Sequence, residues 1–403
     1  MKIRFIGSNE LASLTNATNQ NFKTIVYCTS ASSLICVQVR ILELGLANRA
    51  IPLLKSEASE EQVLLFARQA HSKFSESNVK KGNPVYPAAD RVRHSSISRI
   101  KDDSEKICVL LRHWDAFELS EQCIVDLYST SYSSLEIALL DDASKDLSFL
   151  QLFFRFPEIH VVRSLHKLEY CATFNLLALY ARRLHSKYIF VVNNDTSNFS
   201  KNIFQKLVLK LQDPTIGIVS SRVMDYKGNL IVKQDRKWLG IQFNIATEGY
   251  LLPIKVWNLI GGFNTSLVRF TEDLELVFQL QKLGYKQGRV DDVYFDHLGH
   301  GSSARLNFIP VYYYARNLIW IQKIYFPREK LIKLVISSTQ KTWPVVIREN
   351  SLDSRRYICR KILYLAMGLW AGVFTSLGKR PSIESFEDLL ISKPLGRFKS
   401  KLR

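Results

Sequence analysis

Three stretches of sequence decide the fold of this chain: residues 107–111 (ICVLL), 135–142 (LEIALLDD) and 188–195 (YIFVVNND). Each contains an apolar run, and the last two end in acidic residues. Apolar runs of this length are typical of parallel strands that are buried on both faces. Helical spacing follows the first run, at residues 117–129, and precedes the third, at residues 170–184. Strands that alternate with helices predict an α/β sheet with helices on both faces.

Acidic residues at two strand ends indicate where a ligand is expected. Asp141 and Asp142 end one predicted strand, and Asp195 follows another. Ligands of open α/β sheets bind beyond the carboxyl ends of the strands. We therefore expect the functional site at the edge of the sheet where these carboxylates lie.

The chain divides by pattern into three predicted parts. Residues 1–104 form a small N-terminal α/β appendage, which ends in a polar, linker-like stretch from residue 78. Residues 105–325 form the main α/β domain, and residues 326–403 form a basic helical extension. The elements predicted in the appendage are strands at 24–28 and 51–54 and helices at 33–46 and 60–74.

The charge of the chain indicates an anionic partner or a solvated basic surface. The 403 residues carry a formal net charge of +18. Residues 331–403 hold 14 Lys and Arg against 5 Asp and Glu, which gives +9, half of that total. Such an excess fits a membrane surface or a phosphorylated substrate. No RNA-binding signature or zinc-finger spacing accompanies it, so nucleic acid is not an expected partner.

Residues 362–378 are 17 uncharged, mostly apolar residues between pairs of cations. A membrane-spanning helix needs about 20 such residues. The pattern favours an interfacial helix whose flanking cations reach acidic headgroups, while a buried core helix and a spanning helix stay open.

The six cysteines and the N-terminus indicate a cytoplasmic protein. None of the cysteines forms a CxxC pair, and all lie among apolar neighbours, which predicts buried, reduced thiols. The first residues lack the apolar core of a signal peptide. We expect a cytoplasmic protein that is peripheral at an anionic membrane.

Five short motifs follow one another along the main domain, and each joins polar groups to a strand end or a helix start. A carboxylate after a strand can accept a ring N–H of a pyrimidine. A hard divalent cation takes oxygen ligands and keeps several waters. The motifs are DDASKD at 141–146, VVNNDT at 191–196, GGFN at 261–264 with FTEDLE at 270–275, HLGHGSS at 297–303 and YYYARN at 312–317.

With these motifs in this order, residues 106–326 resemble the family 2 glycosyltransferases of the GT-A (Rossmann-like) fold, particularly the rhamnosyltransferase-like branch. The resemblance implies that Asp141 recognises the donor's base and that Asp142, beside it, is also a donor-binding residue. It also implies that Asn194 and Asp195 bind the donor diphosphate through Mg²⁺ or Mn²⁺, with His297 as the second metal ligand. Each motif also has a purely structural interpretation: a helix-capping loop for Asp141 and Asp142, a polar loop for Asn194 and Asp195, and a structural histidine for His297.

The same resemblance assigns the chemistry on the acceptor side. It implies that Asp273 is the general base, which removes the acceptor hydroxyl proton, and that Glu272 orients the site. Arg316 is implied to hold the diphosphate with its planar guanidinium. The alternatives are acidic residues that complement a helix dipole, and an Arg that is satisfied within a core helix.

The function expected is inverting transfer of a sugar from a nucleotide-diphosphate donor to a glycan or lipid-linked acceptor. Lys167 and Glu169 replace the Asn and Gly frequent in the family's donor loop, and Asn264 replaces a usual Asp. Residues 247–250 also depart from the pattern on the acceptor side. The sugar, the base and the acceptor therefore stay open. The alternative is a non-catalytic GT-A-like scaffold or binding module in a membrane-associated glycan-assembly complex.

Overall fold

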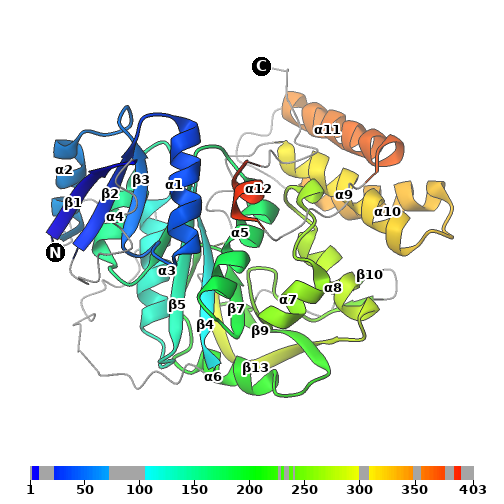
Figure 1. The fold of residues 1–403 in the computed structure, drawn as a ribbon. Helices are drawn as coiled ribbons and strands as arrows, with labels where there is room; N and C mark the ends of the chain where they lie inside the picture. The colour runs from blue at the N-terminus through cyan, green and yellow to red at the C-terminus, as the bar shows by residue number, and fades with distance from the viewer. Residues whose placement is uncertain are drawn as a thin grey trace.

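The computed structural model, drawn in Figure 1, describes residues 2–8, 22–71, 105–225, 228–230, 236–238, 241–298, 308–347, 355–376 and 385–391. The predicted linker, His300 with the serines of the HLGHGSS motif, and residues 377–378 of the apolar segment lie outside these ranges.

A mixed sheet of eight strands forms the centre of the molecule. The strands are β4 (Ile107–His113), β5 (Leu135–Asp142), β6 (His160–Ser164), β7 (Tyr188–Val192), β8 (Thr196–Ser197), β9 (Ile216–Met224), β12 (Gly249–Pro253) and β13 (Lys286–His297). Their order is β6-β5-β4-β7-β12-β9-β13-β8. The first four are parallel to one another, β9 is parallel to β13, and β12 is antiparallel to both of its neighbours.

Helices cover both faces of this sheet, which explains why each predicted strand contains a continuous apolar run. Leu110 of β4 lies in one hydrophobic core, and its neighbours Val109 and Leu111 lie in the other. The covering helices are α3 (Phe117–Tyr128), α4 (Ser148–Arg155), α5 (Glu169–Arg183), α6 (Ile203–Lys210), α7 (Ile254–Ile260) and α8 (Glu272–Lys282). A two-stranded ribbon of β10 (Arg236–Trp238) and β11 (Ile241–Phe243) lies outside the main sheet.

The N-terminal residues form a second, three-stranded parallel sheet. Its elements are β1 (Lys2–Gly7), β2 (Phe22–Cys28), α1 (Ala31–Glu43), β3 (Ala50–Leu54) and α2 (Glu60–His71). The four elements expected here from the sequence are confirmed, and β1 was not foreseen. The sheet lies beside the β6 edge of the main sheet, where the amide of Val161 donates to the carbonyl of Ala47 at 2.9 Å. Its residues share both hydrophobic cores with the main domain.

Three helices form a layer at the opposite side of the molecule from α1 and α2 (Figure 1). They are α9 (Ile309–Tyr325), α10 (Leu331–Ile347) and α11 (Arg355–Phe374). α11 lies close to α9 through two glycines. A Cβ on Gly372 would lie 2.9 Å from the carbonyl oxygen of Arg316, so only a residue without a side chain fits. Gly368 lies against the backbone of Tyr312 in the same way.

The short helix α12 (Phe386–Ile391) packs against α5 and α1 (Figure 1). Leu389 and Leu390 are buried in the core that also contains Ile41 of α1 and Tyr180 of α5. The ring of Phe386 meets that of Tyr180 edge-on, with the ring centroids 6.4 Å apart. The C-terminal part of the chain thus contacts both the N-terminal unit and the main domain.

The α/β class expected from the sequence is confirmed. The chain is a mixed α/β protein with a central, largely parallel sheet, a small N-terminal sheet and C-terminal helices. The three proposed domain boundaries stay predictions. The prediction of buried thiols is confirmed for four cysteines and wrong for Cys36 and Cys359, which are exposed. In the described part of the chain, no helix is both long and apolar enough to cross a bilayer.

Candidate active site

Asp195 and His297, the two predicted metal ligands, contact each other. His297 ends β13 and pairs with Thr196 of β8, and the amide of Leu298 donates to the carbonyl of Asp195 at 3.0 Å. This pairing places Nε2 of His297 at 3.2 Å from Oδ1 of Asp195, with 13% of each side chain exposed. The pair is accessible and lies just beyond the carboxyl end of β7.

The chemistry of this pair fits a divalent cation. A carboxylate oxygen and an imidazole nitrogen are both ligands of Mn²⁺, and Mg²⁺ is bound through one or two carboxylates together with substrate phosphates and water. Among the residues that the structure describes, no group of three or more His, Cys, Asp or Glu side chains could hold a metal ion. A bound diphosphate and water are suitable further ligands for a cation at such a pair.

The side chain of Asn194 belongs to a buried polar network. Its Nδ2 donates to Oγ of Ser120 at 2.9 Å, and the same oxygen lies 2.8 Å from Nδ1 of His113. The other ring nitrogen of His113 contacts Oγ of Ser148 at 2.8 Å. Burial lowers the pKa of His113 to about 4, so the ring is neutral near pH 7. Asn194 thus fixes the turn that presents Asp195.

Asp142 is enclosed and well paired at the end of β5. Arg112 donates to its Oδ2 from Nε at 2.8 Å and from Nη2 at 2.5 Å. The amides of Leu168 and Glu169 donate to its two oxygens at 2.5 and 3.3 Å. Glu169 has a φ of 66°, a left-handed conformation that Gly adopts more easily, and this explains why Gly would suit the position. Asp142 therefore orders the loop before α5.

Asp141 is also fully buried, but it is less completely paired. Its Oδ1 accepts from the amide of Ser144 at 3.3 Å, and its Oδ2 lies 3.8 Å from Nε of Arg163. Oδ2 has no hydrogen-bond partner within the described ranges. Burial raises the pKa of Asp141 to about 7, although the charge of Arg163 opposes this shift. The carboxyl group is thus poised between two protonation states and has one oxygen that can still accept a hydrogen bond.

Arg163 connects this carboxylate to the N-terminal unit. Its guanidinium makes two hydrogen bonds with Glu57, at 2.7 and 2.5 Å, and lies 4.6 Å from the ring centroid of Phe149. Its amide donates to Gln38 of α1 at 3.0 Å. Sequence reasoning missed both Arg112 and Arg163. The signal was present, because each basic residue directly follows the apolar run of its strand, as the predicted aspartates do.

Glu272 and Asp273 open α8 at the end of an unusual loop. Glu272 is 9% exposed, and burial, followed by the charge of Asp273, raises its pKa to about 8. Tyr170 and Tyr250 lie near the two carboxyl groups, whose charges add to burial in raising the pKa of both phenols. Oε2 of Glu272 and the hydroxyl of Tyr250 have no hydrogen-bond partner in the part of the chain described.

These two adjacent carboxyl groups divide into an acid form and a base form. A buried carboxyl beside a like charge keeps its proton, while its neighbour ionises. Glu272 therefore holds its proton more tightly than an ordinary Glu, and the neighbouring Asp273 is only partly buried. The N-terminus of a helix also favours a negative charge at this position.

Arg316 lies inside the protein rather than at the Asp195–His297 pair. The side chain is 1% exposed, and its Nη2 donates to the carbonyls of Ser266 and Leu267 at 2.9 and 3.2 Å. Its guanidinium lies over the rings of Tyr313 and Trp320, at 4.7 and 4.1 Å from their centroids. This geometry matches the alternative considered from the sequence, an Arg satisfied within a core helix.

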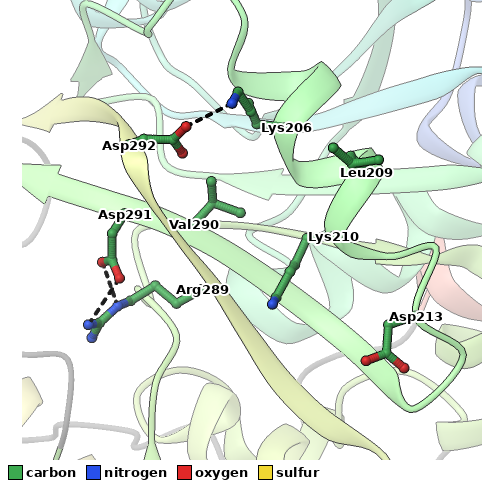
Figure 2. A pocket seen from close by; sticks show the side chains of 8 residues that line it. All are labelled: Lys206, Leu209, Lys210, Asp213, Arg289, Val290, Asp291 and Asp292. Atoms are coloured by element: carbon green, nitrogen blue, oxygen red, sulfur yellow. Dashed lines mark hydrogen bonds and ion pairs between the residues drawn. The ribbon is translucent and has the colours of Figure 1, made fainter.

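A pocket with a volume of about 400 Å³ lies between α6 and β13 (Figure 2). Two of its cations are paired, with Lys206 at 2.8 Å from Asp292 and Arg289 at 2.7 Å from Asp291. Its lining residues are Lys206, Leu209, Lys210, Asp213, Arg289, Val290, Asp291 and Asp292. None of the site residues predicted from the sequence lines it.

Comparison with known proteins gives similarities of fold. No protein-family model matches the sequence, and no curated protein matches it. One similar solved structure is the mannosyltransferase PcManGT from Pyrobaculum calidifontis in complex with GDP-Man and Mn²⁺, with 14% identity and a TM-score of 0.45 over 84% of this chain and 98% of that chain. Another is S. aureus TarS 1-349, with 9% identity and a TM-score of 0.45 over 66% of this chain and 81% of that chain.

Proposed function

We propose that this chain is an inverting glycosyltransferase of the family 2, rhamnosyltransferase-like type, which moves a hexosyl group from a nucleotide-diphosphate sugar to a glycan or lipid-linked acceptor. The observation that carries the proposal is the contact between Asp195 and His297, because two residues from distant motifs meet beyond the end of a central strand. The paired carboxyl groups at the start of α8 supply the second requirement, a general base.

Asp273 is the base in this proposal. The acceptor hydroxyl gives its proton to the carboxylate of Asp273 as its oxygen forms a bond with the anomeric carbon of the sugar. The bond between that carbon and the diphosphate oxygen breaks at the same time, and the diphosphate leaves with the electron pair. Glu272 carries a proton at neutral pH, so it donates a hydrogen bond instead of competing for the acceptor's proton.

The donor is held at the carboxyl ends of β5 and β7. Asp141 is the proposed acceptor of a ring N–H of the base, and its unpaired but fully buried Oδ2 would have to become exposed when the donor binds. Asp142 and Asn194 fix the loops around the donor. Asp195 and His297 would hold Mg²⁺ or Mn²⁺, and the charge of such a cation would offset the negative charge of the departing diphosphate.

We further propose that the enzyme works in the cytoplasm, peripheral at an anionic membrane. α10 and α11 both leave an apolar face exposed, with Trp370 64% and Phe374 70% exposed. Trp side chains favour the boundary between lipid and water. The basic sequence of residues 331–403 supplies the charge that acidic headgroups attract.

One observation favours the second candidate, a non-catalytic scaffold or binding module for glycan assembly. Both Asp141 and Asp142 are fully buried, and Asp142 is already bound to Arg112. Buried carboxylates of this kind stabilise the fold without contacting a nucleotide, as expected of a chain that no longer binds a donor.

A turnover screen separates the two candidates. The purified chain is incubated with a panel of nucleotide-sugars, Mn²⁺ and lipid or glycan acceptors, and the released nucleoside diphosphate is measured. Catalysis predicts release with at least one donor and its loss in Asp273→Asn. Donor binding by calorimetry without release in any combination supports the scaffold, and neither binding nor release rejects both candidates.

A further inference from the structure

The loop that precedes Glu272 and Asp273 has an unfavourable backbone conformation. Val268, Phe270 and Thr271 have φ values of 68°, 63° and 66°. Residues with a side chain rarely adopt this left-handed region, and the β-branched Val and Thr are the least suited to it. Interactions from outside the loop must therefore hold it in place.

Asn317 of α9 supplies the largest set of these interactions. Its Nδ2 lies 3.1 Å from the carbonyl of Leu267, 3.0 Å from that of Arg269 and 2.9 Å from that of Phe270. An amide nitrogen carries two hydrogens, so three carbonyls share them. One fully buried side chain thus binds the loop across the whole left-handed stretch.

Arg316 extends the same contact by one residue toward the start of the loop. It binds the carbonyls of Ser266 and Leu267 from Nη2, and both its Nε and Nη2 bind Oδ1 of Asn317, at 2.9 and 2.7 Å. The guanidinium therefore orients the Asn317 amide so that its nitrogen faces the loop. Because the backbone of Arg316 rests against Gly372, α11 supports the pair from behind.

α5 holds the same loop from its other side. The amide of Cys171 donates to the carbonyl of Val268 at 3.2 Å, and Arg269 forms an ion pair with Glu169. The loop is thus held between two helices, and the first turn of α8, with Asp273, continues directly from it.

We infer that Arg316 and Asn317 are positioning residues for Asp273, rather than donor ligands. This inference rests on the proposed function. They set the place of the general base through the backbone of residues 266–271. Their loss lowers kcat, since a displacement of about 1 Å at a reacting group can cost about 10²-fold in rate. A ligand of the donor diphosphate would instead change the KM for the donor.

The test compares Arg316→Lys and Asn317→Ser with Gln322→Met. Gln322 is a matched control, because it is buried on the same helix but bonds to Leu318 and to Ser338 of α10 instead of the loop. Hydrogen exchange of peptides that cover residues 264–275 is measured first, on variants whose thermal unfolding shows them to be folded. Faster exchange is expected there in the first two variants and not in the control.

Kinetics then separate positioning from donor binding. Arg316→Lys and Asn317→Ser are expected to lower kcat by tenfold or more, with the KM for the donor within twofold of wild type. Unchanged exchange in residues 264–275, or a raised donor KM at an unchanged kcat, overturns the inference. Should the wild type turn over no donor, the proposed function fails, and the exchange measurement still decides whether the pair holds this loop.

Discussion

Replacement of Glu272 by Gln is expected to stabilise the folded protein, and the gain should grow with pH. Glu272 is 9% exposed, and its Oε2 has no hydrogen-bond partner among the described residues. Burial, together with the charge of Asp273, raises its pKa from 4.5 to about 8. Above the pKa of Glu272 in the unfolded chain, folding requires this carboxylate either to take up a proton or to be buried with its charge, and both lower the stability of the wild type. Gln has the same size and does not ionise, so the variant lacks this loss of stability.

The sign and the size of the effect follow from the two pKa values. The folded pKa of Glu272 lies above the unfolded value, so the folded state holds the proton more tightly. Between pH 4.5 and pH 8 the unfolded chain loses this proton while the folded chain keeps it, and the stability of the wild type falls as pH rises. Each pKa unit is worth about 1.4 kcal/mol, so the loss at pH 7 is on the order of 3 kcal/mol.

Urea unfolding at pH 5, 6, 7 and 8 measures this difference. The free energy of unfolding of Glu272→Gln should exceed that of the wild type by less than about 1 kcal/mol at pH 5 and by about 3 kcal/mol at pH 7. Glu275→Gln is the control, because Glu275 is buried on the same helix but accepts hydrogen bonds from Tyr325 and Gln279 at 2.9 and 3.1 Å. It should not be more stable than the wild type. A gain for Glu272→Gln that does not change with pH would refute the reasoning.

Four further outcomes are expected. Asp273→Asn should lower kcat by roughly 10²–10⁴-fold while calorimetry shows donor binding unchanged, and a drop of less than about threefold rejects its role as the base. Asp195→Ala and His297→Ala should each raise the Mn²⁺ concentration needed for half-maximal rate, whereas full activity in EDTA contradicts the metal site. Flotation with acidic liposomes should recover the protein at low salt and release it at 1 M salt, where the electrostatic screening length is only about 3 Å. Retention after both salt and carbonate washes would indicate a helix that spans the membrane. No binding at low salt would reject the proposed membrane association. Gly372→Ala should lower the free energy of unfolding by about 1–3 kcal/mol, because the new Cβ would lie 2.8 Å from the Cβ of Ile319. An unchanged midpoint of chemical denaturation would contradict this prediction and show that α11 can shift away from α9.

The sequence was most informative where one apolar run determined one element. β4, β5 and β7 were predicted because every residue in their runs is buried between two layers of helices. β13 was not, since KQGRVDDVYFDH carries charges along an exposed edge and contains an irregularity between Val290 and Tyr294. Such a strand shows no regular alternation of apolar and polar residues from which it could be predicted.

The sequence motifs named candidate site residues and indicated one contact between them, while other contacts could not be expected. The contact between Asp195 and His297 could be expected because both were matched to metal-binding motifs. The pairing of Arg163 with Glu57 could not, because the two residues come from different units and neither lies in a motif. Arg316 shows the limit most clearly: its motif indicates a functional Arg, but the direction of its side chain depends on the loop carbonyls that it binds.

The placement of α12 has a consequence for how the protein is made. β2 and α1 leave the ribosome early, yet part of the apolar surface that they bury is supplied by Leu389 and Leu390, in the last helix of the described chain to be synthesised. The N-terminal unit therefore cannot complete its core by the usual N-terminal-first order of folding during translation. In a nascent chain that is stalled before α12, the apolar surface that Leu389 and Leu390 cover would stay exposed to solvent.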